Sequence, residues 1–306
     1  MDGGIDDALA LILALRSPEI DLAGITAVSG NVPVEQAATN ALRIVELLDR
    51  EGVWVAKGAH RPLARKPIRA YQFHGRDGLG DSKLPPPRSL LASKNAIGMI
   101  RESLDSTRRR GMTIVCTGPL TNLAVLLRDF PDSKRSIGDV VIMGGAFGLT
   151  EYGIGNETPV AEFNIYSDPE AAKSAFDAHV RLKTVGLDVT TNPRLEMTRE
   201  DYARLRRHKN RVAVFAKQIL EKNFREHERF TLHDPMAVGV AVRPAFYHFS
   251  EYPVSVEVEG EYTVGMTVAD RRSWLAWDRL VGSPVLVCDK VNPRFKEMLL
   301  DRLTGE

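Results

Sequence analysis

The chain has few cysteines and no excess of charge of either sign, and each absence excludes a class of protein. Its 306 residues include 2 cysteines, both in apolar runs typical of buried strands. A disulfide scaffold and a cysteine-ligated metal cluster are therefore excluded. Its 41 Lys and Arg nearly balance 40 Asp and Glu, so no global field attracts nucleic acid or an anionic membrane.

Long hydrophobic segments are missing as well. No apolar stretch reaches the roughly 18 uncharged residues that a membrane span needs, and no basic-then-apolar leader precedes the first motif. We therefore expect a soluble, unexported protein with no nucleic-acid and no membrane partner. Two unpaired cysteines are compatible with the reducing cytoplasm, which is the location we expect.

What the chain does contain is an alternation of short β-branched runs with longer helical patterns across residues 1–306. This pattern predicts one α/β domain with an open, mostly parallel, Rossmann-like sheet and helices on both faces. Apolar runs predict strands at residues 22–28, 53–56, 112–116, 140–143, 182–187 and 285–288, and alternation predicts a hairpin within 253–268. Helical patterns cover residues 34–48, 94–109, 120–128 and 169–178.

Two long segments, residues 57–91 and 144–167, fit neither pattern. Loops of this length inside a compact domain are usually binding loops or lids. Both follow predicted strand ends, and ligands of open α/β sheets bind outside the carboxyl ends of the strands. We therefore expect both segments to be loops beside a binding site.

The opening motif Asp2-Gly3-Gly4-Ile5-Asp6-Asp7 places three carboxylates directly ahead of the apolar run at residues 8–15. Carboxylates so close together repel one another unless a cation lies among them, and a hard divalent ion such as calcium prefers oxygen ligands. The glycines permit a tight turn. Alternatively, Asp6 and Asp7 only complement the positive end of the following helix. The motif by itself leaves both interpretations open.

Other polar segments follow predicted strands or begin helices, and the carboxyl ends of parallel strands meet at one edge of a sheet. These segments are residues 29–31, 74–78, 117–119, 156–164 and 233–235. Each also has a local explanation, because Asn31 and Asp234 are good helix starters and His74 lies in a glycine-rich turn. The coincidence of so many at one predicted edge favours a common site.

Seven motifs occur along the chain in a fixed order: Asp-Gly-Gly-Ile-Asp-Asp-Ala, Ser-Gly-Asn-Val, Phe-His-Gly-Arg-Asp-Gly-Leu-Gly, Cys-Thr-Gly-Pro-Leu-Thr-Asn, Ile-Met-Gly-Gly, Ala-Glu-Phe-Asn-Ile-Tyr-Ser-Asp-Pro-Glu-Ala and His-Asp-Pro. Their order resembles that of the calcium-dependent nucleoside hydrolases, the inosine-uridine-preferring type included, from Asp2 to the terminal helix. The combination of the opening motif with Glu162-Phe163-Asn164 and His233-Asp234 is highly specific.

This resemblance implies hydrolysis of the N-glycosidic bond of ribonucleosides to ribose and free base, with Ca²⁺ as cofactor. The implied calcium ligands are all oxygen donors: Asp2, Asp7, Asp234 and the backbone carbonyl of Thr117. By similarity, Asp2 is also the general base that activates a calcium-held water. The transition state would be oxocarbenium-like, and His233, with His74 as a second candidate, would assist departure of the base.

The remaining matched positions would bind the sugar. By similarity, the 2′- and 3′-hydroxyls contact Asp6, Asn31 and Asn164, and the 5′-hydroxyl contacts Asn156 and Glu162, with Phe163 in the same motif. Met143 would pack beneath the ribose, although a Met that ends a strand is also typical of plain core.

The resemblance says less about base preference and assembly. Segments 74–81 and 222–232 would determine the preferred base, and His233 favours inosine and uridine. His227 lies in the charged segment 225–228, which is typical of a solvated loop. Family members are commonly dimers or tetramers, so we expect a homodimer or homotetramer that acts in purine and pyrimidine salvage.

One family feature is expected to be missing. Family members carry a complete first strand that ends in Asp-x-Asp before the glycine, whereas this chain starts at the last residue of that strand. The neighbouring strands would lose a partner, and an α-amino group would lie beside Asp2, where it could pair with the carboxylate or repel calcium. Either the start was assigned too far downstream, which we favour, or the metal site is impaired.

Two other functions follow from this difference. A chain with an impaired metal site would be a nucleoside- or ribose-binding protein that has lost hydrolysis. A phosphatase or phosphoryl transferase with an Asp-x-Asp nucleophile is disfavoured, because no second Asp precedes the glycines.

Overall fold

The structure is a computed structural model that describes residues 1–82, 84–106 and 111–305. Its helices are α1 (Ile5–Arg16), α2 (Val34–Leu47), α3 (Tyr71–His74), α4 (Ala96–Ser106), α5 (Thr121–Asp129), α6 (Phe163–Ser167), α7 (Pro169–Phe176), α8 (Leu187–Thr190), α9 (Arg199–Arg207), α10 (Arg211–Glu226), α11 (His233–Val242) and α12 (Arg294–Thr304). Its strands are β1 (Gly24–Ala27), β2 (Trp54–Lys57), β3 (Met112–Cys116), β4 (Ile137–Met143), β5 (Leu182–Val185), β6 (Met197–Thr198), β7 (Arg229–Phe230), β8 (Tyr247–Val256), β9 (Thr267–Ala269) and β10 (Ser283–Val291).

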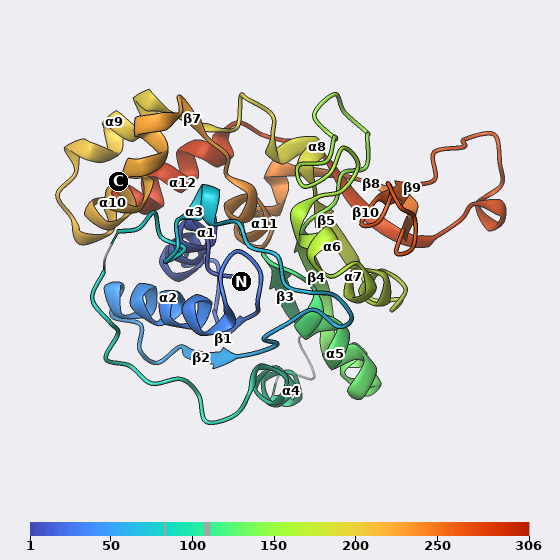
Figure 1. Ribbon diagram of the computed structural model, residues 1–306, viewed down its shortest axis with the longest axis horizontal. Coiled ribbons are helices and arrows are strands. Elements are labelled where there is room, and N and C mark those ends of the chain that lie inside the picture. The colour runs from blue at the N-terminus through green and yellow to red at the C-terminus, as the bar shows by residue number, and fades with distance from the viewer. Residues whose placement is uncertain (83, 107–110, 306) are drawn as a thin grey trace.

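The main sheet has the strand order β3-β4-β5-β10-β8-β9 (Figure 1). Strands β3, β4, β5 and β10 run parallel to one another, whereas β8 is antiparallel to β10 and β9 is antiparallel to β8. Strands β1 and β2 form a separate parallel pair. The predicted α/β fold with an open, mostly parallel sheet is confirmed.

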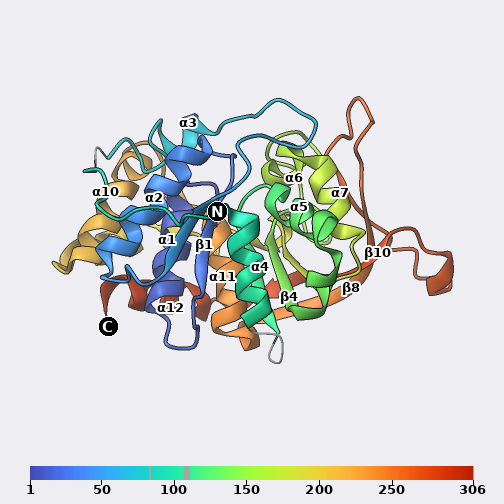
Figure 2. The same cartoon turned by 90° about the horizontal axis from the view of Figure 1, so that it is seen from below.

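Helices cover both faces of the sheet because side chains alternate along each strand. On β4, Val140 and Ile142 belong to a buried cluster with residues of α5 and α7, whereas Val141 and Met143 belong to the larger cluster with α1 and α11. Helix α1 lies beside α11 (Figure 2). All of α1 from Ile5 to Leu15 is buried, which explains why residues 8–15, after Asp6 and Asp7, are apolar on every side of the helix.

The pair β1-β2 is separate from the main sheet, because within the described residues no strand pairs with both β1 and β3. The amino terminus lies between these two strands (Figure 1). The N–H of Val28 donates to the carbonyl of Met1 at 3.0 Å, and the α-amino group of Met1 donates to the carbonyl of Thr26 at 3.1 Å. Gly118, which follows β3, packs so closely that a Cβ on it would lie 2.9 Å from the Cβ of Asp2. Asp2 therefore lies between the carboxyl ends of two strands.

Strand β3 differs from its prediction. Its residues, Cys116 included, are only half-buried or exposed, whereas an apolar run of this kind predicts burial on both sides. Strand β3 is an end strand of the main sheet in the described part of the chain. The side chains of β3 therefore have fewer neighbours than those of a strand in the middle of the sheet.

The two segments predicted to be loops contain short helices, so that prediction is partly wrong. Helix α3 lies within residues 57–91 and α6 within 144–167. Helix α6 begins where it does because the side chain of Glu162 accepts from the N–H groups of Asn164 and Ile165. Strand β5 ends at Val185, two residues before its predicted end. Residues 107–109 of the helix predicted at 94–109 lie outside the described residues.

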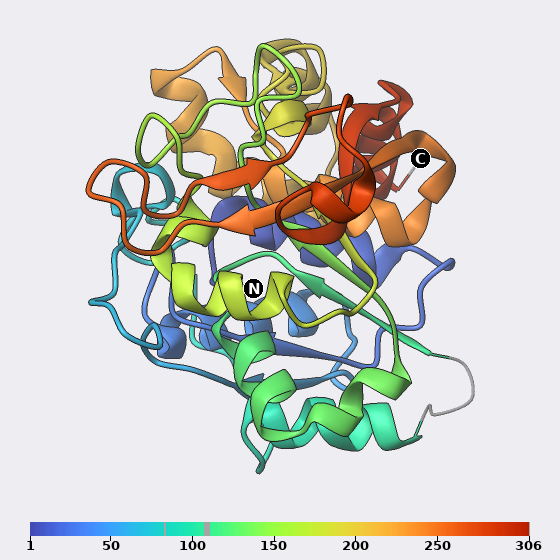
Figure 3. The same ribbon diagram turned by 90° about the vertical axis from the view of Figure 1, so that its right-hand side faces the viewer.

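The predicted hairpin is confirmed by the antiparallel pairing of β8 with β9. The segments that join β8, β9 and β10 project from the body, and Figure 3 looks onto this end, where they are drawn in orange and red. In the described parts of the chain, no helix has the length and apolarity needed to cross a lipid bilayer.

Candidate active site

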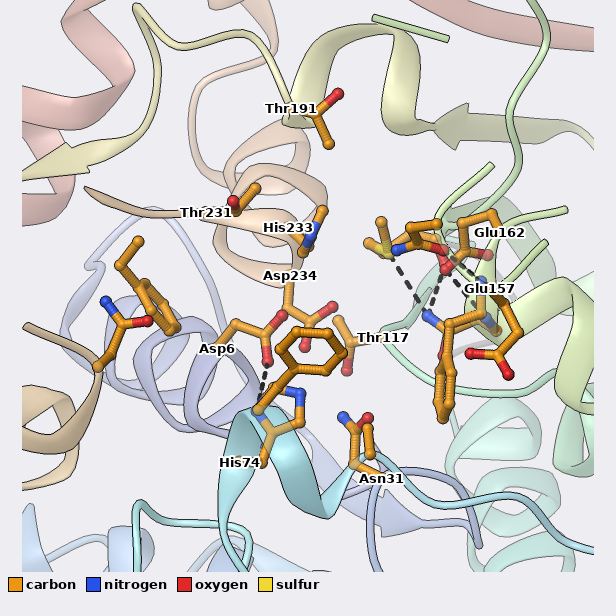
Figure 4. Close-up of a pocket in the computed structure, with 18 of the residues that line it drawn as sticks. Asp6, Asn31, His74, Thr117, Glu157, Glu162, Thr191, Thr231, His233 and Asp234 are labelled. Atoms are coloured by element: carbon orange, nitrogen blue, oxygen red, sulfur yellow. Dashed lines mark hydrogen bonds and ion pairs between the residues drawn. The ribbon is translucent and has the colours of Figure 1, made fainter. Parts of the chain in front are cut away.

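A pocket of about 380 Å³ opens at the carboxyl ends of the strands (Figure 4). The segments that follow β1, β3 and β4 reach it, as predicted from the topology of open α/β sheets. The predicted site residues that line it are Asp6, Asn31, His74, Thr117, Met143, Asn156, Glu162, Phe163, Asn164, His233 and Asp234. Asp2 and Asp7 do not line the pocket and are fully buried.

Three carboxylates meet beside this pocket, and two of them, Asp6 and Asp234, line it. Asp6, Asp7 and Asp234 each offer an oxygen, and these oxygens all lie within 4.8 Å of one another. The first two lie in the first turn of α1 and the third in the first turn of α11, and these two helices pack side by side. The packing of two helices thus brings together residues more than 200 positions apart in the sequence.

Burial makes this cluster electrostatically unfavourable without a cation. Burial and then the charge of Asp7 raise the pKa of Asp6 to about 8. Burial, followed by the charges of Asp6, Asp7 and Asp2, raises the pKa of Asp234 well above its usual range. Within the described residues, the one basic side chain within 4 Å of these three carboxylates is His74, whose Nδ1 lies 3.9 Å from an oxygen of Asp6. Closely spaced buried carboxylate oxygens of this kind fit a hard divalent cation.

The carboxylate of Asp2 is held by Asn31. The N–H of Asn31 donates to one oxygen of Asp2 at 2.7 Å, and its side-chain amide donates to the other at 3.1 Å. Burial and then repulsion by Asp7 raise the pKa of Asp2 well above its usual range. The expected metal ligand Asp2 thus lies next to the three-carboxylate cluster, whereas Asp6, expected only at the sugar, is one of its members.

The backbone and Thr117 fix the orientation of Asp7. One oxygen of Asp7 accepts from the N–H of Gly4 at 2.8 Å, and the other accepts from the hydroxyl of Thr117 at 2.7 Å. Thr117 thus contacts the cluster through its side chain, whereas the resemblance implies a role for its backbone carbonyl.

His74 is a neutral donor in this arrangement. Its Nδ1 accepts from the N–H of Ile5, in the first turn of α1, at 3.1 Å. A backbone N–H can only donate, so the ring proton must lie on Nε2. Burial lowers the pKa of His74 to about 4. At neutral pH this side chain can therefore donate a hydrogen bond through Nε2 without carrying charge.

His233 is also neutral. Burial and then the proximity of His74 lower its pKa to about 4, and its Nδ1 lies 2.8 Å from the hydroxyl of Thr190. Thr190 is fully buried at the end of α8. When the Thr190 hydroxyl donates to Nδ1, the ring proton lies on Nε2, so His233 can also act as a hydrogen-bond donor.

The opposite wall carries the residues expected at the sugar. Glu162 accepts from the N–H groups of Gly145, Asn164 and Ile165, yet burial raises its pKa to about 7. The amide nitrogen of Asn164 donates to the carbonyl of Met143, at 3.1 Å. The side-chain oxygen of Asn156 accepts from the N–H of Phe163. These contacts fix the side chains before any ligand binds.

Comparison with known proteins agrees with this geometry. The family described as inosine-uridine preferring nucleoside hydrolase matches residues 1–297. The chain belongs to this family. Its class of reaction is therefore the hydrolysis of ribonucleosides to ribose and free base, as an N-glycosidase.

Individual relatives of this hydrolase are similar over almost their whole length. The pyrimidine-specific ribonucleoside hydrolase RihA of Shigella boydii serotype 4 (strain Sb227) is 38% identical over 309 residues, which cover 99% of this chain and 96% of the relative. A plant nucleoside hydrolase structure has a TM-score of 0.89 at 30% identity and covers 100% of this chain and 98% of its own. The structure of a purine-preferring ribonucleoside hydrolase from Gardnerella vaginalis has a TM-score of 0.86 at 33% identity and covers 100% of this chain and 96% of its own.

Several other residues of the hydrolase pocket were predicted only through their segments, 57–91, 156–164 and 222–232, and not individually. They reach the pocket because α3 and the end of α10 pack around its rim. His227, which its charged neighbours place in a solvated loop, also lines the pocket. The lining residues that were not singled out one by one are Ala70, Phe73, Glu157, Thr191, Asn223, Arg229, Phe230 and Thr231, and of these Thr191 lies outside the predicted segments.

Proposed function

We propose that this hydrolase cleaves the N-glycosidic bond of ribonucleosides, with inosine and uridine preferred, and that Asp2 is its general base. The observation that carries the proposal is the buried cluster of Asp6, Asp7 and Asp234 at a pocket whose other wall carries amide and carboxylate groups suited to vicinal hydroxyls. Positive charge grows on the sugar in the transition state of such a cleavage. Buried carboxylates around the sugar stabilise that charge.

We propose Ca²⁺ as the cation, held by Asp7, Asp234, Thr117 and Asp2. The oxygen-only donor set supports a hard ion. When bound, the cation would lower the pKa of a water molecule. Asp2 accepts a proton from the attacking water in this scheme, and the two contacts from Asn31 hold its carboxylate in place for that role.

The departing base gains negative charge, which the two histidines can stabilise. Both are neutral at pH 7 because burial lowers each pKa to about 4. We therefore propose that His233 and His74 donate hydrogen bonds to the base through Nε2, so that charge is stabilised without an imidazolium. The bases of inosine and uridine offer carbonyl oxygens that can accept such bonds.

His233→Ala is expected to lower kcat for inosine roughly 10²-fold, the lower end of the range for a group that assists proton transfer. Calcium binding should be unchanged, because the carboxylate oxygens are untouched. The rate at which free base is released from inosine, uridine, cytidine and adenosine, each with calcium and with a chelator, measures this turnover and its dependence on calcium. His248→Ala, an exposed histidine on β8, is the matched control. Unchanged inosine turnover in His233→Ala would remove His233 from the mechanism.

The same assay separates hydrolysis from the alternative, a protein that binds nucleosides without cleaving them. Both oxygens of Asp2 already accept hydrogen bonds from Asn31, an arrangement that a binding protein could also use. Nucleoside binding without base release from any of the four substrates would favour that alternative.

We also propose a homodimer or homotetramer, a cytoplasmic location and a role in purine and pyrimidine salvage. Family membership supports the salvage role, and the two free cysteines suit a reducing compartment. Light scattering of the purified protein measures the assembly.

A further inference from the structure

Two catalytic segments meet at one buried side chain that belongs to neither. The first is the carboxylate loop, residues 2–7, and the second is the His74 loop, residues 74–81. Asn40 lies on α2 and has no exposed surface. Its amide nitrogen donates to the carbonyl of Gly3 at 3.0 Å and to the carbonyl of Asp77 at 2.8 Å. One NH₂ group therefore joins both loops.

Hydrogen bonds to the side-chain oxygen of Asn40 fix the orientation of this amide. The side-chain oxygen of Asn40 accepts from the amide of Gln36 at 2.9 Å and from the guanidinium of Arg43 at 3.1 Å. Both donor hydrogens and both acceptor positions are thus in use. Rotation of the amide by 180° would place its oxygen against two carbonyls, so only one orientation is compatible with the neighbours.

The junction between the two loops has no room for adjustment. Gly3 and Gly78 both have positive φ, 86° and 75°. A Cβ on Gly78 would lie 2.2 Å from the carbonyl oxygen of Gly3. Among the described residues, the other hydrogen-bonded link between the two loops is the direct one from Ile5 to His74. Loss of the Asn40 link therefore halves the number of described side chains that join the loops, because only Asn40 and His74 make such hydrogen bonds.

We propose that Asn40 is a positioning residue that holds the His74 loop in register with the carboxylate loop, so that Nε2 of His74 points at the substrate. This inference rests on the proposed function. A buried asparagine with satisfied hydrogen bonds can also be purely structural. The two roles differ in consequence, because a positioning residue acts on the reaction through His74, whereas a structural residue acts through stability alone.

The test is a double-mutant cycle between Asn40→Leu and His74→Ala. We expect Asn40→Leu to lower kcat/KM for inosine about 10-fold at a temperature well below its Tm, since small misplacements of reacting groups can cost up to about 10²-fold. In the double variant we expect about the same rate as in His74→Ala alone, because coupled residues are not additive. Gln36→Met removes one of the two donors to the Asn40 oxygen but leaves the Arg43 donor and both loop contacts. The amide therefore keeps its orientation, and the wild-type rate should be kept.

Amide hydrogen exchange provides a readout that does not depend on activity. The N–H groups of Gly78 and Gly80 donate to the carbonyls of Gly75 and His74, and we expect them to exchange faster in Asn40→Leu but not in Gln36→Met. Asn40→Ser, which is smaller, replaces Asn40→Leu where the latter does not fold. Additive losses in the cycle, or unchanged exchange across residues 74–81, would overturn the proposal. Absence of hydrolysis by the wild type would overturn the proposed function, and the exchange measurement would still decide the role of Asn40.

Discussion

Asp2→Asn is expected to lower kcat for inosine about 10²–10⁴-fold at saturating calcium, the range for loss of a general base. An amide has nearly the shape of the carboxylate but cannot accept the proton of the attacking water. Asp2 is fully buried, so bulk water cannot replace it as the base. Base release measured across a range of calcium concentrations gives kcat independently of any change in calcium affinity.

The control for this variant is Asp21→Asn, the same chemical change at an exposed position. It should leave kcat within about twofold of the wild-type value, since exposed substitutions usually change little. If Asp2→Asn kept a wild-type kcat once calcium was saturating, Asp2 would be a metal ligand only and the base would have to be another residue.

Asp234→Asn is expected to raise the Tm of the metal-free protein and to abolish its response to calcium. Without a cation, Asp234 is destabilised by burial and by repulsion from Asp6, Asp7 and Asp2, and a neutral amide removes that repulsion. A ligand that binds only the folded state stabilises it by about 2.7 kcal/mol at 100 times its Kd. Wild type should therefore gain stability with calcium and lose it with a chelator, whereas Asp234→Asn should respond to neither.

A buried aspartate outside the cluster provides the matched control. Asp188 accepts from the N–H groups of Phe147, Leu149 and Thr150. Asp188→Asn should lower Tm equally with and without calcium, because those three contacts are unrelated to a cation. A calcium-dependent rise in Tm that persisted in Asp234→Asn would contradict a metal site at the three carboxylates.

The edge of the sheet at which the site lies could be predicted from sequence. Apolar runs end where polar segments begin, and parallel strands with covering helices place those ends together. Asn31 and Thr117 follow predicted strands, and the structure places both at the pocket. The short helices α3 and α6 were not predicted, because four or five residues are too few to show a helical period.

Individual contacts between distant segments were harder to predict. The resemblance implied that Asp7 and Asp234 share a site, whereas the presence of Asp6 beside them depends on the packing of α11 against α1. The link from Asn40 to Gly3 and Asp77 depends on the packing of α2, and in sequence Asn40 is only a polar residue in a helical pattern. The same holds for His227, because its neighbours in the sequence indicate solvent whereas its neighbours in space form a pocket.

By itself, the sequence determined the fold class, the family and the residue types available for the chemistry, because periodicity and motif order are local properties of the chain. Only the tertiary structure decided the charge and the contacts of those residues. Burial, which depends on the whole fold, makes both histidines neutral and raises the pKa of Asp2, Asp6 and Asp234. Helix packing selects which carboxylates share a site and places Asn40 between residues 2–7 and 74–81.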